Sequence, residues 1–179
     1  GPTGMETDSP VTITGISGEA SEMERVTLTI DMLSDNANHV GDGGGLPALI
    51  DGKVNTYYHT KWNAPVTTEA HYVQIKLNKP LKDLCFEYDA RQSGVNNGGD
   101  VKAATIYGSM NGEFFESMGN EEFNLPTTNG GHATAKNNVS GKQAYNYIRF
   151  TPTARRDKDP LDYTVAGSAW WNMSEIYLY

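Results

Sequence analysis

The sequence predicts an all-β fold, a single β-sandwich of jelly-roll type, and three observations support this prediction. Short segments alternate between apolar and polar residues, as half-buried strands do. Turn residues separate these segments, and the chain contains 19 glycines. No apolar pattern of helical spacing is long enough for a crossover helix, so a parallel sheet is not expected. A length of 179 residues suits one domain with its own core.

The expected strands each place apolar side chains on one face. They cover residues 25–33, 71–77, 84–91, 103–109, 113–118, 145–151 and 171–179. The second is the clearest, because Val73, Ile75 and Leu77 alternate with polar residues. Asn78-Lys79-Pro80 is predicted to end it as a turn, and Met110-Asn111-Gly112 is predicted to form a hairpin turn. Residues 119–141 are expected to hold one more strand and long loops.

Two segments are predicted to lie outside the regular structure. Residues 1–21 are polar and read as a lead-in or linker, with a possible edge strand at 11–14, so the sandwich domain is assigned to residues 22–179. Residues 34–45 are rich in Asn, Asp and Gly, and we expect a mobile loop there without a site.

Charge and composition exclude several functions. The net charge of −8 repels phosphate backbones and anionic lipid, so nucleic-acid binding is not expected. No apolar run reaches the roughly 18 residues of a transmembrane helix, so no membrane insertion is expected. Cys85 is the only cysteine, so no intramolecular disulfide can form, and its apolar surroundings predict a buried residue.

Residues 47–62 are the most informative stretch. Leu49 and Ile50 form an apolar anchor, and Asp51-Gly52 then forces a turn. The Asp51 carboxylate, the Thr56 hydroxyl and the carbonyls between them could converge on a hard cation such as calcium, which prefers oxygen ligands. Aromatic residues and one imidazole follow at once, and binding groups tend to sit on such loops.

This stretch resembles a known family. The run Ala48-Leu-Ile-Asp-Gly, with Thr56 and then Tyr58-His-Thr-Lys-Trp62, is similar to the opening signature of coagulation factor 5/8 type C (discoidin) domains. The bacterial branch of that family is close to carbohydrate-binding module family 32. The resemblance covers about residues 26–179 and implies a galactose-binding-like sandwich. Animal discoidin domains are resembled less well, because a single cysteine cannot form the disulfide that links their termini.

The resemblance implies a structural calcium ion (Ca2+). Its side-chain ligands would be Asp51, Thr56 and Glu175, and its backbone ligands would be the carbonyls of Ile50, Lys53 and Ser174. The position of Lys53 is often Asp or Asn in relatives, but there the carbonyl is the usual ligand. The alternative is an ordinary Asp-Gly turn with a solvated glutamate.

The resemblance also implies a sugar site in three loops. A sugar presents a C–H face and a ring of hydroxyls, so it suits an aromatic platform with fixed hydrogen-bonding groups. The implied contacts are His59, Trp62, Arg91, Asn96 or Asn97, and Trp170 or Trp171. The alternatives are a histidine satisfied within its loop, a core Trp62, and an ion pair from Arg91 to Asp89 or Asp100. Adjacent residues of an extended segment point in opposite directions, so one of the two last tryptophans is expected to be in the core.

The predicted function is therefore non-catalytic recognition of a terminal galactose-type or N-acetylhexosamine-type sugar of a glycan. The expected setting is a module of a larger secreted, periplasmic or cell-surface bacterial protein. The alternative is a structural or protein–protein interaction sandwich that does not bind sugar. Phospholipid binding needs exposed apolar residues with basic neighbours, which the charge disfavours. No enzyme is predicted, because the four histidines lack metal-binding spacing and no nucleophile motif occurs.

Overall fold

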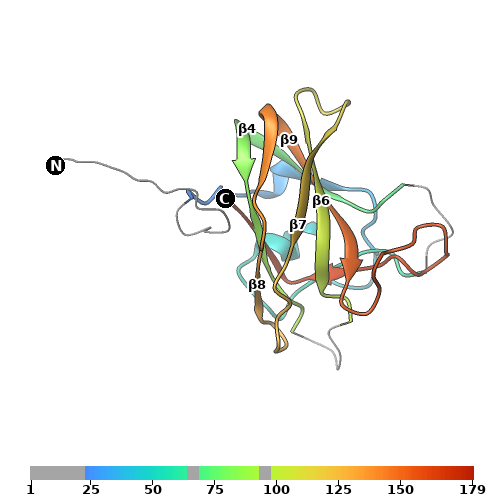
Figure 1. Ribbon diagram of the computed structural model, residues 1–179. Coiled ribbons are helices and arrows are strands. Elements are labelled where there is room, and N and C mark those ends of the chain that lie inside the picture. Colours follow the sequence, from blue (N-terminus) through green and yellow to red (C-terminus); the bar gives the residue numbers. More distant parts are fainter. Residues whose placement is uncertain (1–22, 64–68, 93–97) are drawn as a thin grey trace.

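The computed structural model describes residues 23–63, 69–92 and 98–179, and it confirms the predicted β-sandwich (Figure 1). A five-stranded antiparallel sheet has the order β2-β4-β9-β6-β7, a three-stranded sheet has the order β11-β5-β8, and β10 pairs with β3. The predicted lead-in 1–21, with its possible edge strand, lies outside the described residues. The described elements are the 3-10 helices η2 (Ile30–Met32) and η3 (Leu46–Ile50) and the strands β2 (Leu33–Asp35), β3 (Tyr58–His59), β4 (Val73–Leu84), β5 (Phe86–Asp89), β6 (Val101–Ser109), β7 (Glu116–Glu122), β8 (His132–Thr134), β9 (Val139–Arg155), β10 (Asn172–Met173) and β11 (Glu175–Leu178).

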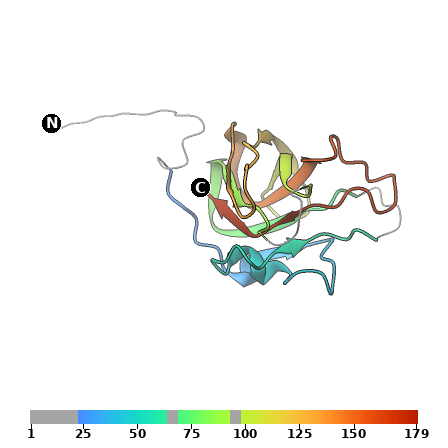
Figure 2. The same cartoon turned by 90° about the horizontal axis from the view of Figure 1, so that it is seen from below.

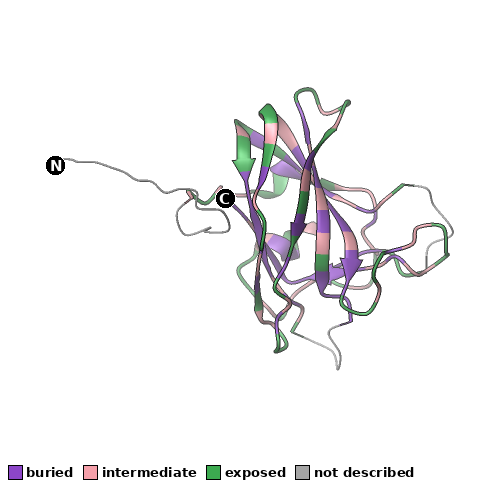
Figure 3. Ribbon diagram, viewed as in Figure 1, coloured by how far each residue is buried: buried purple, intermediate pink, exposed green. Residues whose placement is uncertain are grey.

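The central strands form where the sequence alternates. On β9, Ile148 and Phe150 point into the core, whereas Tyr147 and Arg149 are partly exposed on the outer face. Figure 3 shows the same alternation along β6, where buried and intermediate residues follow one another. The five-stranded sheet therefore has one apolar face and one polar, aromatic face.

Aromatic side chains join the two sheets. The ring centroids of Phe86 on β5 and Phe150 on β9 lie 4.9 Å apart, and Trp171 meets Phe150 edge-on at 6.3 Å. Each of these three side chains is at most 1% exposed. Cys85 lies in the same core, as predicted, and burial raises the pKa of its thiol to about 12. The core is thus assembled mainly from large flat side chains that span the sandwich.

Three predictions about strands are wrong in detail. Residues 171–179 do not form one strand but two, because β10 pairs with β3 and β11 pairs with β5 in a different sheet. Residues 25–33 do not form one strand: the Val26 amide donates to the Leu178 carbonyl (2.8 Å), and the chain then turns into η2, where the Met32 amide donates to the Thr29 carbonyl (3.0 Å). Residues 78–80 do not end β4. Pro80 sits where the pairing of β4 with β9 shifts register, so its missing N–H costs no ladder bond and the strand continues to Leu84.

A short ladder links residues 47–62, which we call the first loop, to the end of the chain. Asn172 pairs with His59 and Met173 pairs with Tyr58. Next to this ladder, the Trp171 amide donates to the Thr60 hydroxyl (2.9 Å), and the Thr60 amide donates to the Trp171 carbonyl (3.1 Å). Figure 2 shows the C-terminal strands, in red, lying between the blue and cyan segments and the rest of the sandwich. This pairing brings Trp170 and Glu175 to the first loop.

Among the described residues, no helix has the length and apolar character needed to cross a membrane.

We predict that Phe150→Ala lowers the free energy of unfolding by about 3–5 kcal/mol, because it leaves a cavity between the sheets. Phe114→Ala is the matched control: that ring is 77% exposed, and we expect a change within about 0.5 kcal/mol. Urea unfolding followed by tryptophan fluorescence measures both values. Equal effects of the two substitutions would contradict the assigned core.

Candidate functional site

Four of the predicted sugar contacts come together around the first loop. His59 stacks on Trp170, with ring centroids 5.5 Å apart and planes 24° apart. The Arg91 guanidinium lies 3.8 Å above the Tyr57 ring, and the Tyr57 and His59 rings are 6.4 Å apart. Trp62 joins the group through Asp42. We refer to the residues Asp42, Tyr57, His59, Trp62, Arg91 and Trp170 as the loop cluster.

Asp42 fixes two aromatic side chains. One of its carboxylate oxygens accepts from the Tyr57 hydroxyl (2.7 Å), and the other accepts from Nε1 of Trp62 (2.8 Å). Partial burial acts to raise the pKa of Asp42, but these two hydrogen bonds and the charge of nearby Arg91 act the other way, and the pKa lies below its usual value. The carboxylate therefore stays ionised and keeps the Trp62 indole in place, although 46% of the Trp62 surface is exposed.

His59 has a defined tautomer. Its Nδ1 lies 2.6 Å from the Thr60 carbonyl oxygen. Because a carbonyl only accepts, Nδ1 carries the proton and Nε2 is left as an acceptor. Burial lowers the pKa of His59, so the ring is neutral near pH 7. The nearby Arg91 guanidinium is a donor, so the two residues together offer the acceptor and the donor that a sugar hydroxyl needs.

The two adjacent tryptophans have different roles. Trp171 is fully buried in the core, so it cannot contact a sugar, and only Trp170 remains a candidate. Trp170 is partly exposed and lies against His59, and the Arg155 guanidinium sits 3.9 Å from its ring centre. Its faces are therefore partly used within the protein, and Trp62 is the more open aromatic surface.

Close backbone contacts hold these loops together. A Cβ at Gly167 would lie 2.6 Å from the Trp62 carbonyl oxygen, and a Cβ at Gly99 would lie 2.9 Å from the Trp170 ring. Figure 1 shows the segment that joins β9 to β10, in red, at the right of the molecule. Gly167 also has φ of +70°, a conformation that favours glycine.

The remaining predicted contacts, Asn96 and Asn97, lie outside the described residues. The carboxylates proposed as alternative partners of Arg91 have other bonds. Asp100 accepts from Arg156 (2.9 Å), and Asp89 lies 2.6 Å from Nδ1 of His132 and accepts from the Tyr177 hydroxyl (2.6 Å).

The predicted calcium ligands gather at the Asp51 turn. One Asp51 carboxylate oxygen accepts from the Thr56 hydroxyl (2.5 Å), and the Lys53 carbonyl oxygen lies 3.5 Å from that hydroxyl. Glu175 reaches the turn from β11, where its carboxylate accepts from the Gly52 amide (2.8 Å). The other two predicted ligands, Ile50 and Ser174, adjoin Asp51 and Glu175 in the chain, and the Ser174 hydroxyl donates to the Val54 carbonyl (2.8 Å).

The electrostatics of this turn suit a cation. Glu175 is only 3% exposed, and burial together with the neighbouring Asp51 carboxyl raises its pKa to about 7. A bound cation would relieve the repulsion between the two carboxyl groups. In the part of the chain that the structure describes, no three His, Cys, Asp or Glu side chains could hold a metal among themselves. The donors here are instead two carboxylates, a hydroxyl and carbonyls, a set that fits calcium.

Sequence reasoning missed Asp42, His39 and Tyr57. Asp42 and His39 lie in residues 34–45, which were expected to be a loop without a site, yet His39 meets Trp62 edge-on with centroids 4.8 Å apart. Their only sequence signal is an acid and an imidazole in a glycine-rich segment, with no spacing that connects them to residue 62. Tyr57 lies within the informative stretch, but nothing in its pattern shows that it stacks under Arg91.

The fold and the loop cluster define a galactose-binding-like β-sandwich with its polar and aromatic residues on the loops. The sequence matches the F5/8 type C domain family over residues 34–175, and the chain belongs to this family. No curated protein sequence is significantly similar to the chain.

Solved structures of carbohydrate-binding modules share the fold. CpGH89CBM32-5 from Clostridium perfringens, solved with GalNAc-β-1,3-galactose, has a TM-score of 0.54 at 20% identity, over 82% of this chain and 93% of that one. CBM32-3 from a family 31 glycoside hydrolase of the same organism has a TM-score of 0.57 at 18% identity, over 89% and 96%. The family 32 module of C. perfringens NanJ, solved with galactose, has a TM-score of 0.50 at 18% identity, over 90% and 96%.

We predict that His59 and His132 titrate on opposite sides of the usual histidine pKa of about 6.5. Burial lowers the pKa of His59. For His132, burial acts in the same direction, but hydrogen bonds to Asp89 and Glu87 outweigh it and raise the pKa. NMR titration of the imidazole Cε1 protons measures both values.

The two shifts have opposite effects on stability. The contribution of His59 is present above about pH 6.5 and is lost as the pH falls below that value, because the unfolded chain binds the proton more readily. The contribution of His132 is present below about pH 6.5 and is lost as the pH rises through its folded pKa. A His59 midpoint above that of His132 would contradict the assigned environments.

Proposed function

We propose that this chain is a non-catalytic carbohydrate-binding module that recognises a terminal galactose-type or N-acetylhexosamine-type sugar through the loop cluster. The observation that carries the proposal is the grouping of a neutral His59, the Arg91 guanidinium and a fixed, exposed Trp62. His59 Nε2 and Arg91 would bond adjacent sugar hydroxyls, and the indole of Trp62 would pack against the C–H face of the ring. The structural relatives solved with galactose or GalNAc support this choice of sugar.

Binding at this site is expected to be weak. A net free energy of about 4–6 kcal/mol corresponds to a Kd between roughly millimolar and tens of micromolar. Useful retention on a glycan surface would then need several modules acting together. This fits a module of a larger extracytoplasmic protein, either secreted, periplasmic or at the cell surface, with other modules of the same protein as its neighbours.

A calcium ion at the Asp51 turn is the second part of the proposal. Asp51, Thr56 and Glu175 would supply side-chain oxygens, and the carbonyls of Lys53, Ile50 and Ser174 would complete the shell. The ion would supply no chemistry to a reaction. It would neutralise two neighbouring carboxylates and tie the first loop to β11, which also keeps Trp170 beside His59.

We predict that the double variant His59→Ala, Arg91→Ala weakens glycan binding by about tenfold or more, because each lost hydrogen bond is worth about 0.5–1.5 kcal/mol. A glycan array identifies the sugar class, and calorimetry with GalNAc-β-1,3-galactose measures the affinity. Arg25→Ala is the matched control. The Arg25 guanidinium also lies over a tyrosine ring, 4.5 Å above Tyr177, but it is outside the loop cluster.

Two outcomes would contradict the glycan proposal. One is a folded, calcium-loaded protein that binds no glycan on the array, which would favour the structural or protein-interaction alternative. The other is a double variant that binds the sugar as tightly as the unchanged protein does.

We predict that calcium raises the melting temperature and that EDTA reverses the effect. Calcium at about 100 times its Kd adds about 2.7 kcal/mol of stability, which for a chain of this size is a shift of about 5–10 °C. Asp51→Asn should remove most of this shift. Asp162→Asn is the control, since Asp162 also accepts bonds from a nearby threonine, Thr164, in an exposed turn.

The calcium effect should also depend on pH. Because Glu175 must lose its proton to bind the ion and its pKa is about 7, calcium affinity should rise as the pH rises through that value. A melting temperature that does not respond to calcium at pH 8, as measured by differential scanning fluorimetry, would disprove the calcium site.

A further inference from the structure

A concave site lies on the outer face of the five-stranded sheet. It is a cavity of about 220 Å³. This is smaller than the roughly 300–1,000 Å³ of pockets that hold drug-sized ligands, and it suits a single small ring. None of its lining residues belongs to the loop cluster. The cavity is lined by Glu69, Ala70, Tyr72, Tyr107, Phe115, Arg149 and Thr151.

Arg149 is held rigidly at this cavity. Its guanidinium carbon lies 4.0 Å from the centre of the Tyr72 ring and 3.8 Å from the centre of the Phe115 ring. Its Nε donates to the side-chain oxygen of Gln74 (2.7 Å). Among residues 23–63, 69–92 and 98–179, no carboxylate forms an ion pair with Arg149. The side chain is therefore preorganised by two rings and an amide, and its remaining N–H groups can serve a ligand.

Paired strands lie under the cavity. Arg149 on β9 lies opposite Gln74 on β4 and opposite Tyr107 on β6, so three neighbouring strands present the site. Thr151 follows two residues after Arg149 on the same face. Figure 1 shows β4, β9 and β6 side by side in this sheet. Sites built on strands keep their geometry better than sites built on loops.

We propose that this cavity binds a neutral saccharide ring and is a second glycan site, independent of the loop cluster. Tyr107 offers the aromatic ring for a C–H face, since the Tyr72 and Phe115 rings already hold Arg149, and Arg149, Glu69 and Thr151 offer donors and acceptors for hydroxyls. An anionic ligand fits less well, because Glu69 lines the cavity and the chain carries a net charge of −8. Two sites on one module would raise its retention on a dense glycan surface, because both could be occupied at once.

The test is an NMR titration of the 15N-labelled protein with six free sugars. Five are neutral, namely galactose, N-acetylgalactosamine, glucose, N-acetylglucosamine and mannose, and glucuronate is the acidic comparison. Each is used at about 50 mM, well above the millimolar Kd that corresponds to about 4 kcal/mol. We expect at least one neutral sugar to shift the amides of Tyr107 and Phe115 and the Nε–H of Arg149. The His59→Ala, Arg91→Ala variant should keep these shifts, which separates this site from the loop cluster.

Two variants and one control sharpen the test. Tyr107→Ala should weaken binding at the cavity about fivefold, the size expected for one lost aromatic contact. Arg149→Lys should weaken it similarly, because lysine keeps the charge but loses the planar fork. Tyr147→Ala is the matched control. Tyr147 is a partly exposed tyrosine on the same strand and the same face as Arg149, but it does not line the cavity.

Four results would overturn the proposal. The first is the absence of shifts at Tyr107, Phe115 and Arg149 with every neutral sugar, and the second is a response to glucuronate alone. The third is shifts at the cavity that disappear in the His59→Ala, Arg91→Ala variant. The fourth is an equal loss of binding in Tyr107→Ala and Tyr147→Ala, which would show a general disturbance of the sheet face.

Discussion

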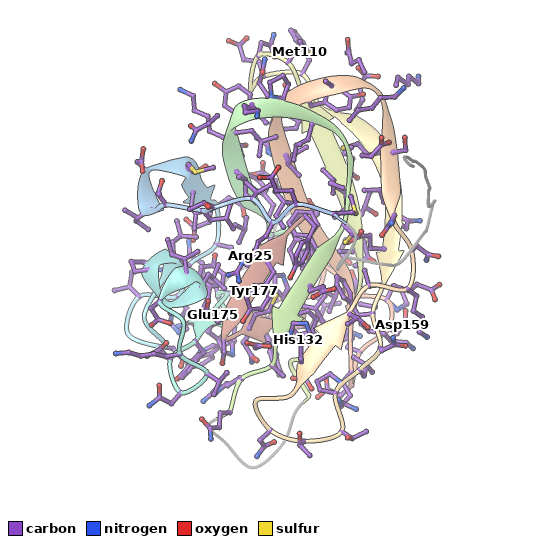
Figure 4. All side chains as sticks on the ribbon, turned by 90° about the vertical axis from the view of Figure 1, so that its left-hand side faces the viewer. Arg25, Met110, His132, Asp159, Glu175 and Tyr177 are labelled. Carbon is purple, nitrogen blue, oxygen red and sulfur yellow. The ribbon has the colours of Figure 1, made fainter. Side chains whose placement is uncertain are left out.

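The loop cluster and the predicted calcium turn both depend on the pairing of the first loop with the last strands. Thr60 and Trp171 exchange hydrogen bonds although they lie 111 positions apart in the sequence. On one side of this hydrogen-bonded pair, Trp170 lies against His59. On the other side, Glu175 reaches the turn at Asp51 and Gly52. In Figure 4, Glu175 lies beside Arg25 and Tyr177, whereas Met110 lies at the top of the view. A calcium ion bound at Asp51 and Glu175 would therefore strengthen the same pairing that positions the loop cluster.

Much of the fold could be predicted from the sequence because strands of this kind have a direct pattern. Val73, Ile75 and Leu77 alternate with polar residues, and all three are buried on β4. The family signature at residues 48–62 predicted the loop that carries His59 and Trp62. The local pattern was not sufficient at two places. At residues 25–33, the Val26 amide bonds to the Leu178 carbonyl at the far end of the chain, and at Pro80 the pairing of β4 with β9 shifts register.

The candidate site was harder to predict, because its organisation comes from segments that are distant in the sequence. Asp42 orders Tyr57 and Trp62 from a glycine-rich loop that has no periodicity. Trp170 and Trp171 are neighbours, and which one faces the core depends on where β10 begins, which only the pairing with β3 determines. The contacts that hold Arg149 combine β9 with Tyr72, just before β4, and Phe115, in the turn after β6, so no single stretch predicts them.

The most direct test of the account is a crystal structure of the protein grown with calcium and soaked with GalNAc-β-1,3-galactose. The account predicts a sugar ring packed on Trp62, with its hydroxyls bonded to His59 and Arg91, and a cation between Asp51 and Glu175. A sugar bound only away from the loop cluster, or a water molecule bridging Asp51 and Glu175 in place of the cation, would contradict it.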